Sequence, residues 1–259
     1  MSSSAIPTRG PRALPGEPAP RSRLSVRVWR ALTPSAIGPA RGRSFEALRR
    51  AMESRLDARR LRERLPELLA PLRAPDARRA SLLPLYRRFV SRVAPPASAM
   101  SLEVAGFLVE LCERVRPRRI LEIGTGFGSV ALRRTESVRD GASMIWSADD
   151  DPARLARTRA FLAQESLATE HLLSWRELRE SSQCGFDLAL HELVLDGDAV
   201  LEDLLDRVTP GGLVLLDGAQ RSTVERRARR LLAEAGAEQF SLRALTRDCF
   251  GRHALLALR

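Results

Sequence analysis

The clearest chemical signal in the sequence is a loop in which three glycines stand at every second position. An apolar run, residues 120–123, contains Glu122 and leads into Gly124, Gly126 and Gly128. Glycine lets a backbone approach a ligand closely, and a helix that follows such a loop offers unpaired N–H groups in its first turn. A strand, a glycine turn and a helix in this order are typical of α/β folds that bind nucleotide-like ligands.

The spacing of these glycines separates two kinds of ligand. A dinucleotide fingerprint requires G-x-G-x-x-G, whose third glycine would fall where the sequence has Ser129. The chain instead has Glu-x-Gly-x-Gly-x-Gly, with Glu122 two residues before the first glycine. A tight structural turn would also use glycines, but three of them together with an acid favour a binding loop.

The stretch LEIGTGFGS, residues 121–129, resembles motif I of the class I S-adenosylmethionine-dependent methyltransferases, most of all in their small-molecule O-methyltransferase branch. The resemblance extends from about Ala97 to the end of the chain. It implies that S-adenosylmethionine binds at the loop and that Glu122 hydrogen-bonds toward the amino-acid end of this cofactor. Backbone N–H groups at three positions of the loop would contribute as well. The residues implied in cofactor binding are Glu122, Gly124, Thr125, Gly126, Phe127, Gly128 and Ser129.

A run of acids marks the end of the next expected strand. Asp149, Asp150 and Asp151 precede Pro152, which suits the first position of a helix with Asp151 as its N-cap. One carboxylate can accept hydrogen bonds from both hydroxyls of a ribose. By the resemblance, the ribose-binding acid is Asp149, and Asp150 is the next candidate. A dinucleotide enzyme would use an acid at the same place, so Asp149 indicates an adenosine-type ligand without choosing between the two.

The adenine pocket is expected after the third strand, residues 171–175. Members of the family often carry an acidic or small polar residue there, whereas this chain has Ser174 and Trp175. Trp175 is a candidate for stacking on the base. A lone tryptophan at a strand end more often belongs to the core or its rim, so both interpretations stay open.

The end of the fourth strand, where this fold usually determines the reaction type, has the residues His191 and Glu192. They match neither the Asp/Asn-Pro-Pro-aromatic motif of nucleic-acid amine methyltransferases nor the Pro-Cys of the cytosine C5 enzymes. By resemblance to metal-dependent catechol-type enzymes, Glu192 takes the first metal position and Asp217 the second. Gly218 replaces the third ligand, and Leu195 replaces the catalytic lysine. Because a divalent ion needs several oxygen ligands, we expect no metal site.

Without a metal, methylation of a hydroxyl needs a base for the proton of the acceptor. Histidine suits this work near neutral pH, and His191 and Glu192 are the candidate catalytic residues. Side chains alternate along a strand, so only one of the two is expected to face the acceptor. Glu192 holds the family's functional position. His191 stands where an aliphatic residue is usual and is more readily explained as a buried structural histidine.

These residues require an α/β fold that brings the carboxyl ends of several strands together. Strands alternate with helices after residue 97, which predicts a doubly wound, mostly parallel sheet with right-handed crossovers. The resemblance implies a Rossmann-like sheet of seven strands that ends in an antiparallel hairpin. Expected helices include residues 129–138 and 222–235. The expected strands are residues 119–123, 144–148, 171–175, 186–192, 213–217, 240–245 and 253–258.

The first third of the chain carries no methyltransferase pattern. Residues 1–43 are rich in Pro, Gly, Ser, Ala and Arg, and we expect a disordered tail because little apolar surface is available to offset ordering. Residues 44–96 predict an α-helical extension. Ser44 is a candidate N-cap of its first helix and Asp76 of its second. The methyltransferase domain is expected at residues 97–259.

Composition limits the partners. The net charge is +11 and all 43 basic residues are arginine. Asn is absent as well as Lys, which is typical of a GC-rich genome, so a nucleic-acid partner is compatible with the charge but is not favoured. No run approaches the roughly 18 apolar residues of a membrane helix, and the three cysteines lie far apart. We expect a cytoplasmic protein without membrane contact. A homodimer is compatible with the sequence.

The sequence thus predicts a methyltransferase that uses S-adenosylmethionine and a small-molecule acceptor with a hydroxyl or, less readily, an amine. Two other functions stay open. One is an RNA or protein methyltransferase that docks through the basic extension. The other is a non-catalytic module for S-adenosylmethionine binding or assembly, which the missing lysine and third metal ligand would favour.

Overall fold

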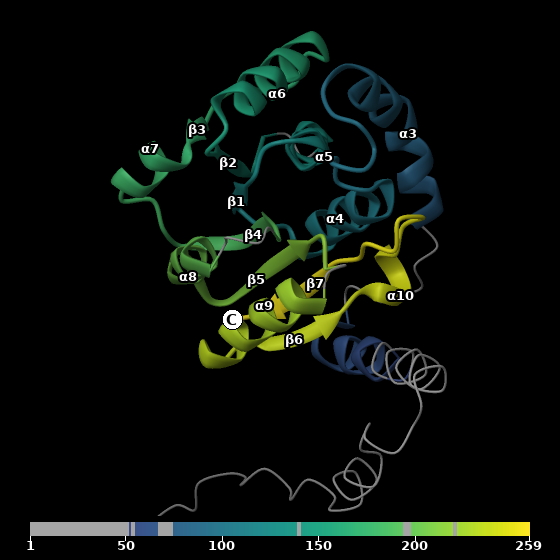
Figure 1. The fold of residues 1–259 in the computed structure, drawn as a ribbon, viewed down its shortest axis with the longest axis vertical. Coiled ribbons are helices and arrows are strands. Elements are labelled where there is room, and N and C mark those ends of the chain that lie inside the picture. Colours follow the sequence, from purple (N-terminus) through teal and green to yellow (C-terminus); the bar gives the residue numbers. More distant parts are fainter. Residues whose placement is uncertain (1–51, 53–54, 67–74, 139–140, 194–197, 220–221) are drawn as a thin grey trace, which may run out of the picture. The chain divides into compact units, whose positions relative to one another are not determined.

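The computed structural model describes residues 52, 55–66, 75–138, 141–193, 198–219 and 222–259. One compact unit comprises Arg49–Arg259. The expected tail, residues 1–43, and the candidate cap Ser44 lie outside the described residues. Residues 55–64 are helical. The labelled elements of Figure 1 are α3 (Pro75–Arg92), α4 (Leu102–Val115), β1 (Arg119–Ile123), α5 (Phe127–Val138), β2 (Met144–Asp149), α6 (Pro152–Gln164), β3 (Leu172–Ser174), α7 (Trp175–Glu180), β4 (Phe186–Glu192), α8 (Asp198–Arg207), β5 (Val208–Asp217), α9 (Ser222–Glu234), β6 (Glu238–Ser241), α10 (Arg243–Thr246) and β7 (Leu255–Leu258).

The strands of the described residues form one seven-stranded sheet in the order β3-β2-β1-β4-β5-β7-β6. β1 pairs in parallel with β2 and β4, β2 with β3, and β4 with β5. β7 runs antiparallel to both β5 and β6. The predicted Rossmann-like sheet with an antiparallel C-terminal hairpin is therefore confirmed. The strand order reverses between β1 and β4, which is where open α/β sheets bind their ligands.

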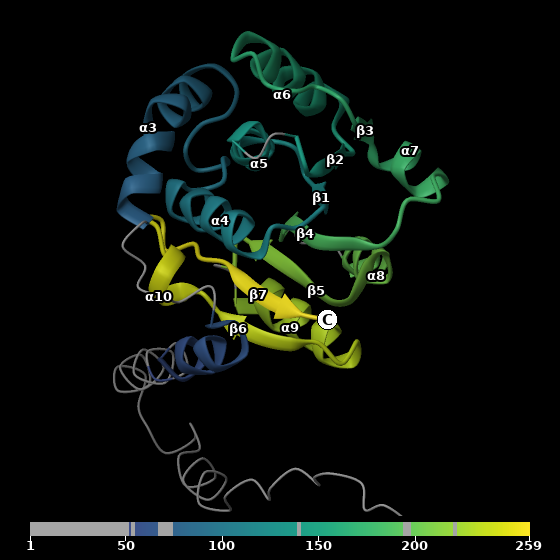
Figure 2. The same cartoon turned by 180° about the vertical axis from the view of Figure 1, so that it is seen from behind.

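Alternate residues of the strands supply two hydrophobic cores, one on each face of the sheet. Ile120 and Leu188 belong to the core shared with α3, α4, α5 and α6. Their neighbours Leu121 and Ala189 belong to the core shared with α7, α8 and α9. Figures 1 and 2 show the same division, with α4 and α5 on one side of the sheet and α8 and α9 on the other. Because both faces are covered, β1 and β4 are apolar along most of their length.

Helix α3 packs into the same core as the predicted catalytic domain. The ring of Phe89 is buried, with its centroid 5.2 Å from that of Phe161 in α6 and 5.5 Å from that of Phe127 in α5. Leu61, in the helix of residues 55–64, is buried in this core too. The described residues of the predicted extension therefore share one core with the residues that follow Ala97.

Two helices begin earlier than the sequence prediction placed them. α3 begins at Pro75, so Asp76 lies inside the helix and is not its cap. Proline suits a first helical turn because its missing N–H would have no partner there. α5 begins at Phe127 and not at position 129. The buried Phe127 ring, 5.0 Å from the ring of Tyr86, anchors this first turn against α3.

Two differences lie in the C-terminal part of the sheet. β5 begins at Val208 and so starts before the expected strand of residues 213–217. The register of its pairing with β4 shifts between the pairs Val208–Phe186 and Leu213–Leu188, as at a β-bulge. Residues 243–245, expected as the end of the strand 240–245, belong to α10. The Thr246 hydroxyl closes this turn by donating to the carbonyl of residue 242 at 3.0 Å.

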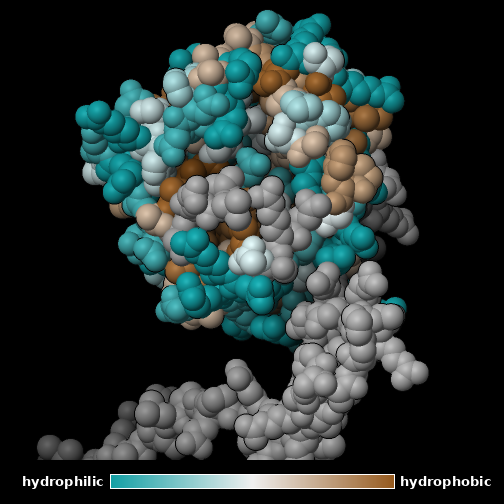
Figure 3. All heavy atoms as spheres, in the orientation of Figure 1, coloured by the Kyte–Doolittle hydropathy of each residue, from teal (hydrophilic) through white to brown (hydrophobic). Residues whose placement is uncertain are grey.

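The described surface is mostly polar. Residues on the face drawn in Figure 3 are predominantly hydrophilic. The arginine-rich α9 turns Ala228 and Leu232 into the core and leaves Arg226 and Arg230 exposed, as is usual for an amphipathic surface helix. Among the described residues, every helix is too short or too polar to cross a membrane.

Replacing Phe89 by alanine should lower the free energy of unfolding by about 3–5 kcal/mol, because loss of the ring leaves a cavity between α3, α5 and α6. Urea unfolding followed by circular dichroism measures the change. Phe250→Ala is the matched control, since this side chain is 47% exposed and its loss should cost less than about 1 kcal/mol. Equal effects of the two changes would contradict the role of α3 in the core.

Candidate active site

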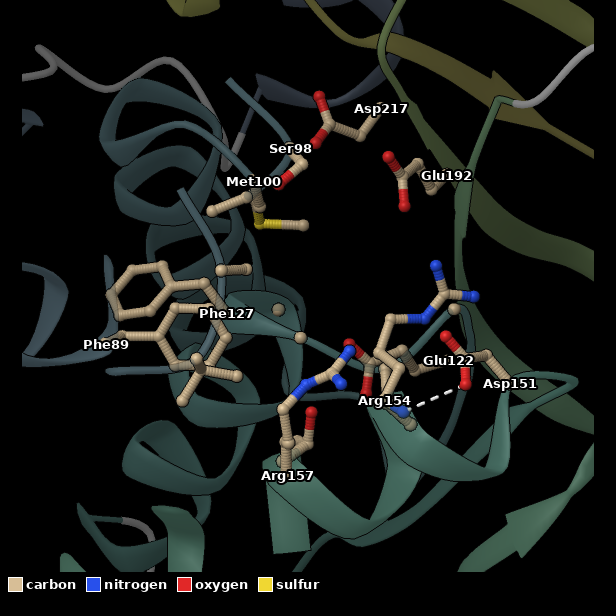
Figure 4. Close-up of a pocket in the computed structure, with 18 of the residues that line it drawn as sticks. Phe89, Ser98, Met100, Glu122, Phe127, Asp151, Arg154, Arg157, Glu192 and Asp217 are labelled. Atoms are coloured by element: carbon tan, nitrogen blue, oxygen red, sulfur yellow. Dashed lines mark hydrogen bonds between the residues drawn. The ribbon is translucent and has the colours of Figure 1, made fainter. Parts of the chain in front are cut away.

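A cavity of about 230 Å³ opens at the carboxyl ends of β1, β4 and β5. Figure 4 shows it between the glycine loop, α3, α6 and the segment of residues 93–100 that precedes α4. Five of the sequence-predicted residues, Ser129, Asp149, Asp150, Trp175 and His191, do not line it. Those that do are Glu122, Gly124, Thr125, Gly126, Phe127, Gly128 and Glu192.

The glycines of the loop are required for different reasons. Gly124 has a φ of +93°, which side chains rarely allow. A Cβ on Gly128 would lie 2.6 Å from Oε1 of Glu122 and 2.9 Å from Cδ2 of Leu190, so only glycine lets α5 approach β1 and β4 this closely. A Cβ on Gly126 would meet no atom within 4 Å. Packing therefore does not explain Gly126, which borders the open cavity.

Glu122 of β1 is fully buried and joins three elements. Its Oε2 accepts hydrogen bonds from the hydroxyls of Ser129 in α5 and Ser147 in β2, both at 2.6 Å. Arg133, also buried, donates from Nη1 to the Ser147 hydroxyl at 2.9 Å and from Nη2 to the carbonyl of Glu170 at 3.2 Å. Ser129 thus acts through its hydroxyl inside this network and does not face the cavity.

The second carboxylate oxygen of Glu122, Oε1, has no hydrogen-bond partner, although Glu122 lines the cavity. Burial raises the pKa of Glu122 to about 7, against the lowering effect of Ser129, Ser147 and Arg133. A buried polar atom left without a partner points to a missing ion, water or ligand. Glu122 is therefore placed to accept a hydrogen bond from a donor in the cavity, such as an ammonium group.

Asp149 stands at the end of β2, but the chain itself already occupies its carboxylate. Thr125 donates to Oδ2 from its N–H at 2.6 Å and from its hydroxyl at 2.7 Å. Arg154 donates to both oxygens at 2.7 Å, and the N–H of Asp151 reaches Oδ1 at 2.9 Å. Burial pushes the pKa of Asp149 upward, but these hydrogen bonds outweigh it and lower the pKa. The N–H of Thr125, expected to face the cofactor, is directed at Asp149.

Asp150 and Trp175 also lie elsewhere than a cofactor-binding role would need. Asp150 is exposed in the turn before α6, and its neighbour Asp151 caps that helix as predicted. Trp175 begins α7 because Ser174 and Glu177 form a capping box that starts a helix at this point. The Trp175 ring is buried in the core shared with α7, α8 and α9. It packs as a core residue and does not border the cavity.

The two candidate catalytic residues of β4 point in different directions, as the strand period requires. His191 is buried, with Nδ1 3.4 Å from the carbonyl oxygen of Ile123. Burial lowers the pKa of His191 to about 4, so its ring is neutral at neutral pH. Glu192 is open to the cavity. Of the pair, only Glu192 is placed to meet an acceptor.

A second acid stands beside Glu192. Asp217 is its register partner at the end of β5, and both residues line the cavity; Figure 4 shows the two carboxylates at the same end of it. Burial and the nearby charge of Glu192 raise the pKa of Asp217 to about 7. Burial also raises the pKa of Glu192, opposed by the charges of Arg154 and Arg252. Two carboxyl groups so placed do not both ionise readily, because the charge of one disfavours the charge of the other.

These strand ends do not suit a divalent ion held by the protein. Gly218 has no side chain at the third ligand position, and Oδ1 of Asp217 accepts the Gly218 N–H at 2.7 Å. In the described part of the chain, no three His, Cys, Asp or Glu side chains gather as metal ligands would. A divalent ion takes about six oxygen ligands, and the donor set of Glu192 and Asp217 falls short of that.

Three arginines that the sequence analysis did not single out shape the cavity. Arg154 and Arg157 line it from α6. Arg252, close to the C-terminus, donates to backbone carbonyls of residues 96–99 at 2.8–3.0 Å and so fixes the segment that forms one wall. Arg252 also forms an ion pair with Asp248 at 2.7 Å. The separation of four residues between these opposite charges is the one sequence signal that points to Arg252. In a chain so rich in arginine, nothing local distinguishes Arg154 or Arg157 from solvated side chains.

Several solved structures share the fold of this chain. Cofactor-bound Rv0187 from MTB aligns with a TM-score of 0.51 and 20% identity, over 80% of this chain and 96% of that protein. The O-methyltransferase TomG from Streptomyces achromogenes, in complex with SAM, aligns with a TM-score of 0.50 and 21% identity, over 70% of this chain and 88% of TomG. The SAH-bound methyltransferase PaMTH1 from Podospora anserina aligns with a TM-score of 0.52 and 17% identity, over 69% of this chain and 87% of PaMTH1. This chain has the class I methyltransferase fold. No protein-family model and no curated protein matches its sequence.

The buried acid Glu122 should make the stability of this fold depend on pH. The pKa of Glu122 is about 7 in the folded chain against an ordinary 4.5. Between these pH values the folded state binds more protons than the unfolded state, so stability falls as the pH rises. Glu122→Gln preserves the shape without the charge and should lose less stability over this range. Urea unfolding at both pH values measures it, with the exposed Glu63→Gln as control. A variant as sensitive to pH as the wild type would contradict the assignment.

Proposed function

We propose that this chain is a methyltransferase that binds S-adenosylmethionine and transfers its methyl group to a hydroxyl of a small molecule. The observation that carries the proposal is the unpartnered Oε1 of the buried Glu122, which lines a cavity beside the open space at Gly126. A fold shared with SAM- and SAH-bound methyltransferases supports the same ligand. An amine is the less favoured acceptor.

The glycine-loop end of the cavity would hold the cofactor. Glu122 would accept a hydrogen bond from the ammonium group of its amino-acid part, and Gly126 would leave room for the ligand beside the loop. Phe89 and Phe127 give this end an apolar wall. When bound, S-adenosylmethionine supplies an electrophilic methyl group on a positively charged sulfur. The task of the protein is then to align an acceptor oxygen and to remove its proton.

The other end of the cavity, where β4 and β5 end, would receive the acceptor. As the acceptor oxygen bonds to the methyl carbon and the carbon–sulfur bond breaks, the hydroxyl proton moves to a carboxylate. Glu192 is the residue we assign to this step, and Asp217 beside it can share the proton. Burial raises the pKa of both acids, which suits a general base because each carboxylate then binds a proton more readily than an ordinary one.

One observation favours a second candidate function, a module that binds the cofactor without catalysis. The ends of β4 and β5 carry the acids Glu192 and Asp217, but Gly218 has no side chain where the metal-dependent catechol-type enzymes place a third ligand. A module of this kind would bind S-adenosylhomocysteine but would methylate no acceptor. Binding and turnover measurements on the same protein therefore separate the two functions.

Titration calorimetry with S-adenosylhomocysteine, the demethylated product, tests the cofactor assignment. We expect saturable binding with a Kd of about 1 mM or tighter. Gly126→Ala should weaken it at least about tenfold, since the added methyl group takes space beside the ligand. The same variant should unfold within about 0.5 kcal/mol of the wild type, because no atom lies within 4 Å of the new group. No detectable heat with the wild type at millimolar ligand would refute the proposal.

Turnover with methyl-labelled S-adenosylmethionine and a panel of phenols and catechols tests the base. Glu192→Gln should lower kcat by about 100-fold or more while S-adenosylhomocysteine affinity changes little. His191→Gln alters the neighbouring residue outside the cavity and should leave kcat within a few-fold of the wild type. Similar losses in the two variants would argue against Glu192 as the base, and Asp217→Asn would then show whether its partner carries the role.

A further inference from the structure

The carboxylate of Asp149 has no capacity left for a ribose. Five N–H and O–H groups donate to it, whereas an ionised carboxylate offers about four lone-pair positions. The side chain of Asp149 is also fully shielded from solvent. A ligand with two hydroxyls can reach these oxygens only if donors already present leave them.

The donors differ in their freedom to leave. Three of the five donors are backbone or loop groups. They are the N–H and the hydroxyl of Thr125, which is buried in the glycine loop, and the N–H of Asp151 in the cap of α6. The other two belong to the guanidinium of Arg154. This side chain is 41% exposed and lines the cavity. Arg154 can depart by side-chain rotation alone, whereas the others would require the loop or the helix cap to open.

We propose that Arg154 gates the ribose site: it occupies Asp149 in the ligand-free chain, and the two ribose hydroxyls replace its two N–H groups when S-adenosylmethionine or S-adenosylhomocysteine binds. This inference rests on the proposed function. Two donors leave and two arrive, so the buried carboxylate remains satisfied throughout, which matters because an unsatisfied buried charge is costly. Arg154 is then a specificity-determining residue, since only a ligand with both hydroxyls restores both hydrogen bonds.

A second carboxylate is available to the released guanidinium. The hydrogen bonds to Asp149 raise the pKa of Arg154, and the charge of Glu192 adds to this effect. Figure 4 shows the Arg154 guanidinium in the space between the glycine-loop end of the cavity and Glu192. A move from Asp149 toward Glu192 keeps the cation near an acid. Binding of the cofactor would thereby alter the charge near Glu192, at the end of the cavity where the acceptor would bind.

The test is calorimetric titration of the full-length protein with S-adenosylhomocysteine. Methionine at position 154 fills similar space but cannot compete for Asp149, so Arg154→Met should bind about tenfold more tightly than the wild type. Arg154→Lys keeps the charge but lacks the two-pronged donor geometry, and its gain should be smaller. Arg157→Met is the matched control, because it removes the same charge from the same wall without touching Asp149. It should not tighten binding.

Thermal unfolding establishes whether each variant is folded. If Arg154→Met does not fold, the binding affinity of Arg154→Lys is the test of the gate. Tighter binding by the variants at position 154, without a gain in Arg157→Met, supports the gate. Binding that is unchanged or weaker in a folded variant at position 154, or a gain that Arg157→Met shares, overturns it while the proposed function stands. Absence of binding in the wild type and in every variant overturns the proposed function and this inference together.

Discussion

The buried carboxylate of Glu122 is the constraint on which the rest of the site depends. Its hydrogen bonds to Ser129 and Ser147 join β1 to α5 and β2, and Arg133 brings a compensating charge into the same network. Burial disfavours the ionised acid, as its raised pKa shows, so a role in stability alone does not account for it. Gly128 must be glycine because a Cβ there would lie 2.6 Å from this carboxylate. The close approach of α5 to the sheet therefore follows from keeping an acid at the edge of the cavity.

The two ends of the cavity are built in different ways. The glycine-loop end is built around β1, the loop and α5, which are consecutive in the chain, and Phe89 of α3 completes its apolar wall. The opposite end combines Glu192 and Asp217 from neighbouring strands with the segment of residues 93–100. That segment is fixed by Arg252, more than 150 residues further along the chain. Substitutions in such a wall can alter the acceptor without disturbing the loop, which is consistent with one fold serving many acceptors.

Sequence reasoning succeeded where the deciding interactions are local. β1 and β4 have the predicted bounds, and strand alternation correctly indicated that only one of His191 and Glu192 faces the cavity. It did not supply the hydrogen-bond partners or the local surroundings of the other candidate residues. Asp149 was predicted from its place at a strand end, but its state is decided by Thr125, 24 residues away, and by Arg154, which the composition hides among many arginines. Trp175 was expected to end a strand, but the capping box around it favours a helix, and the helix turns its ring into the core.

The acids of the cavity and the guanidinium of Arg154 limit one another. Burial raises the pKa of Glu192, and the largest opposing influence is the charge of Arg154, which is itself held by Asp149. Glu192 and Asp217 compete for ionisation because like charges at adjacent strand ends repel. The cation therefore affects which of the two acids is charged. Under the proposed function, a base must be ionised before it can take a proton from the acceptor, so the ionisation of Glu192 would depend on the ion pair of Arg154 and Asp149. Distance along the chain does not isolate the two halves of this site.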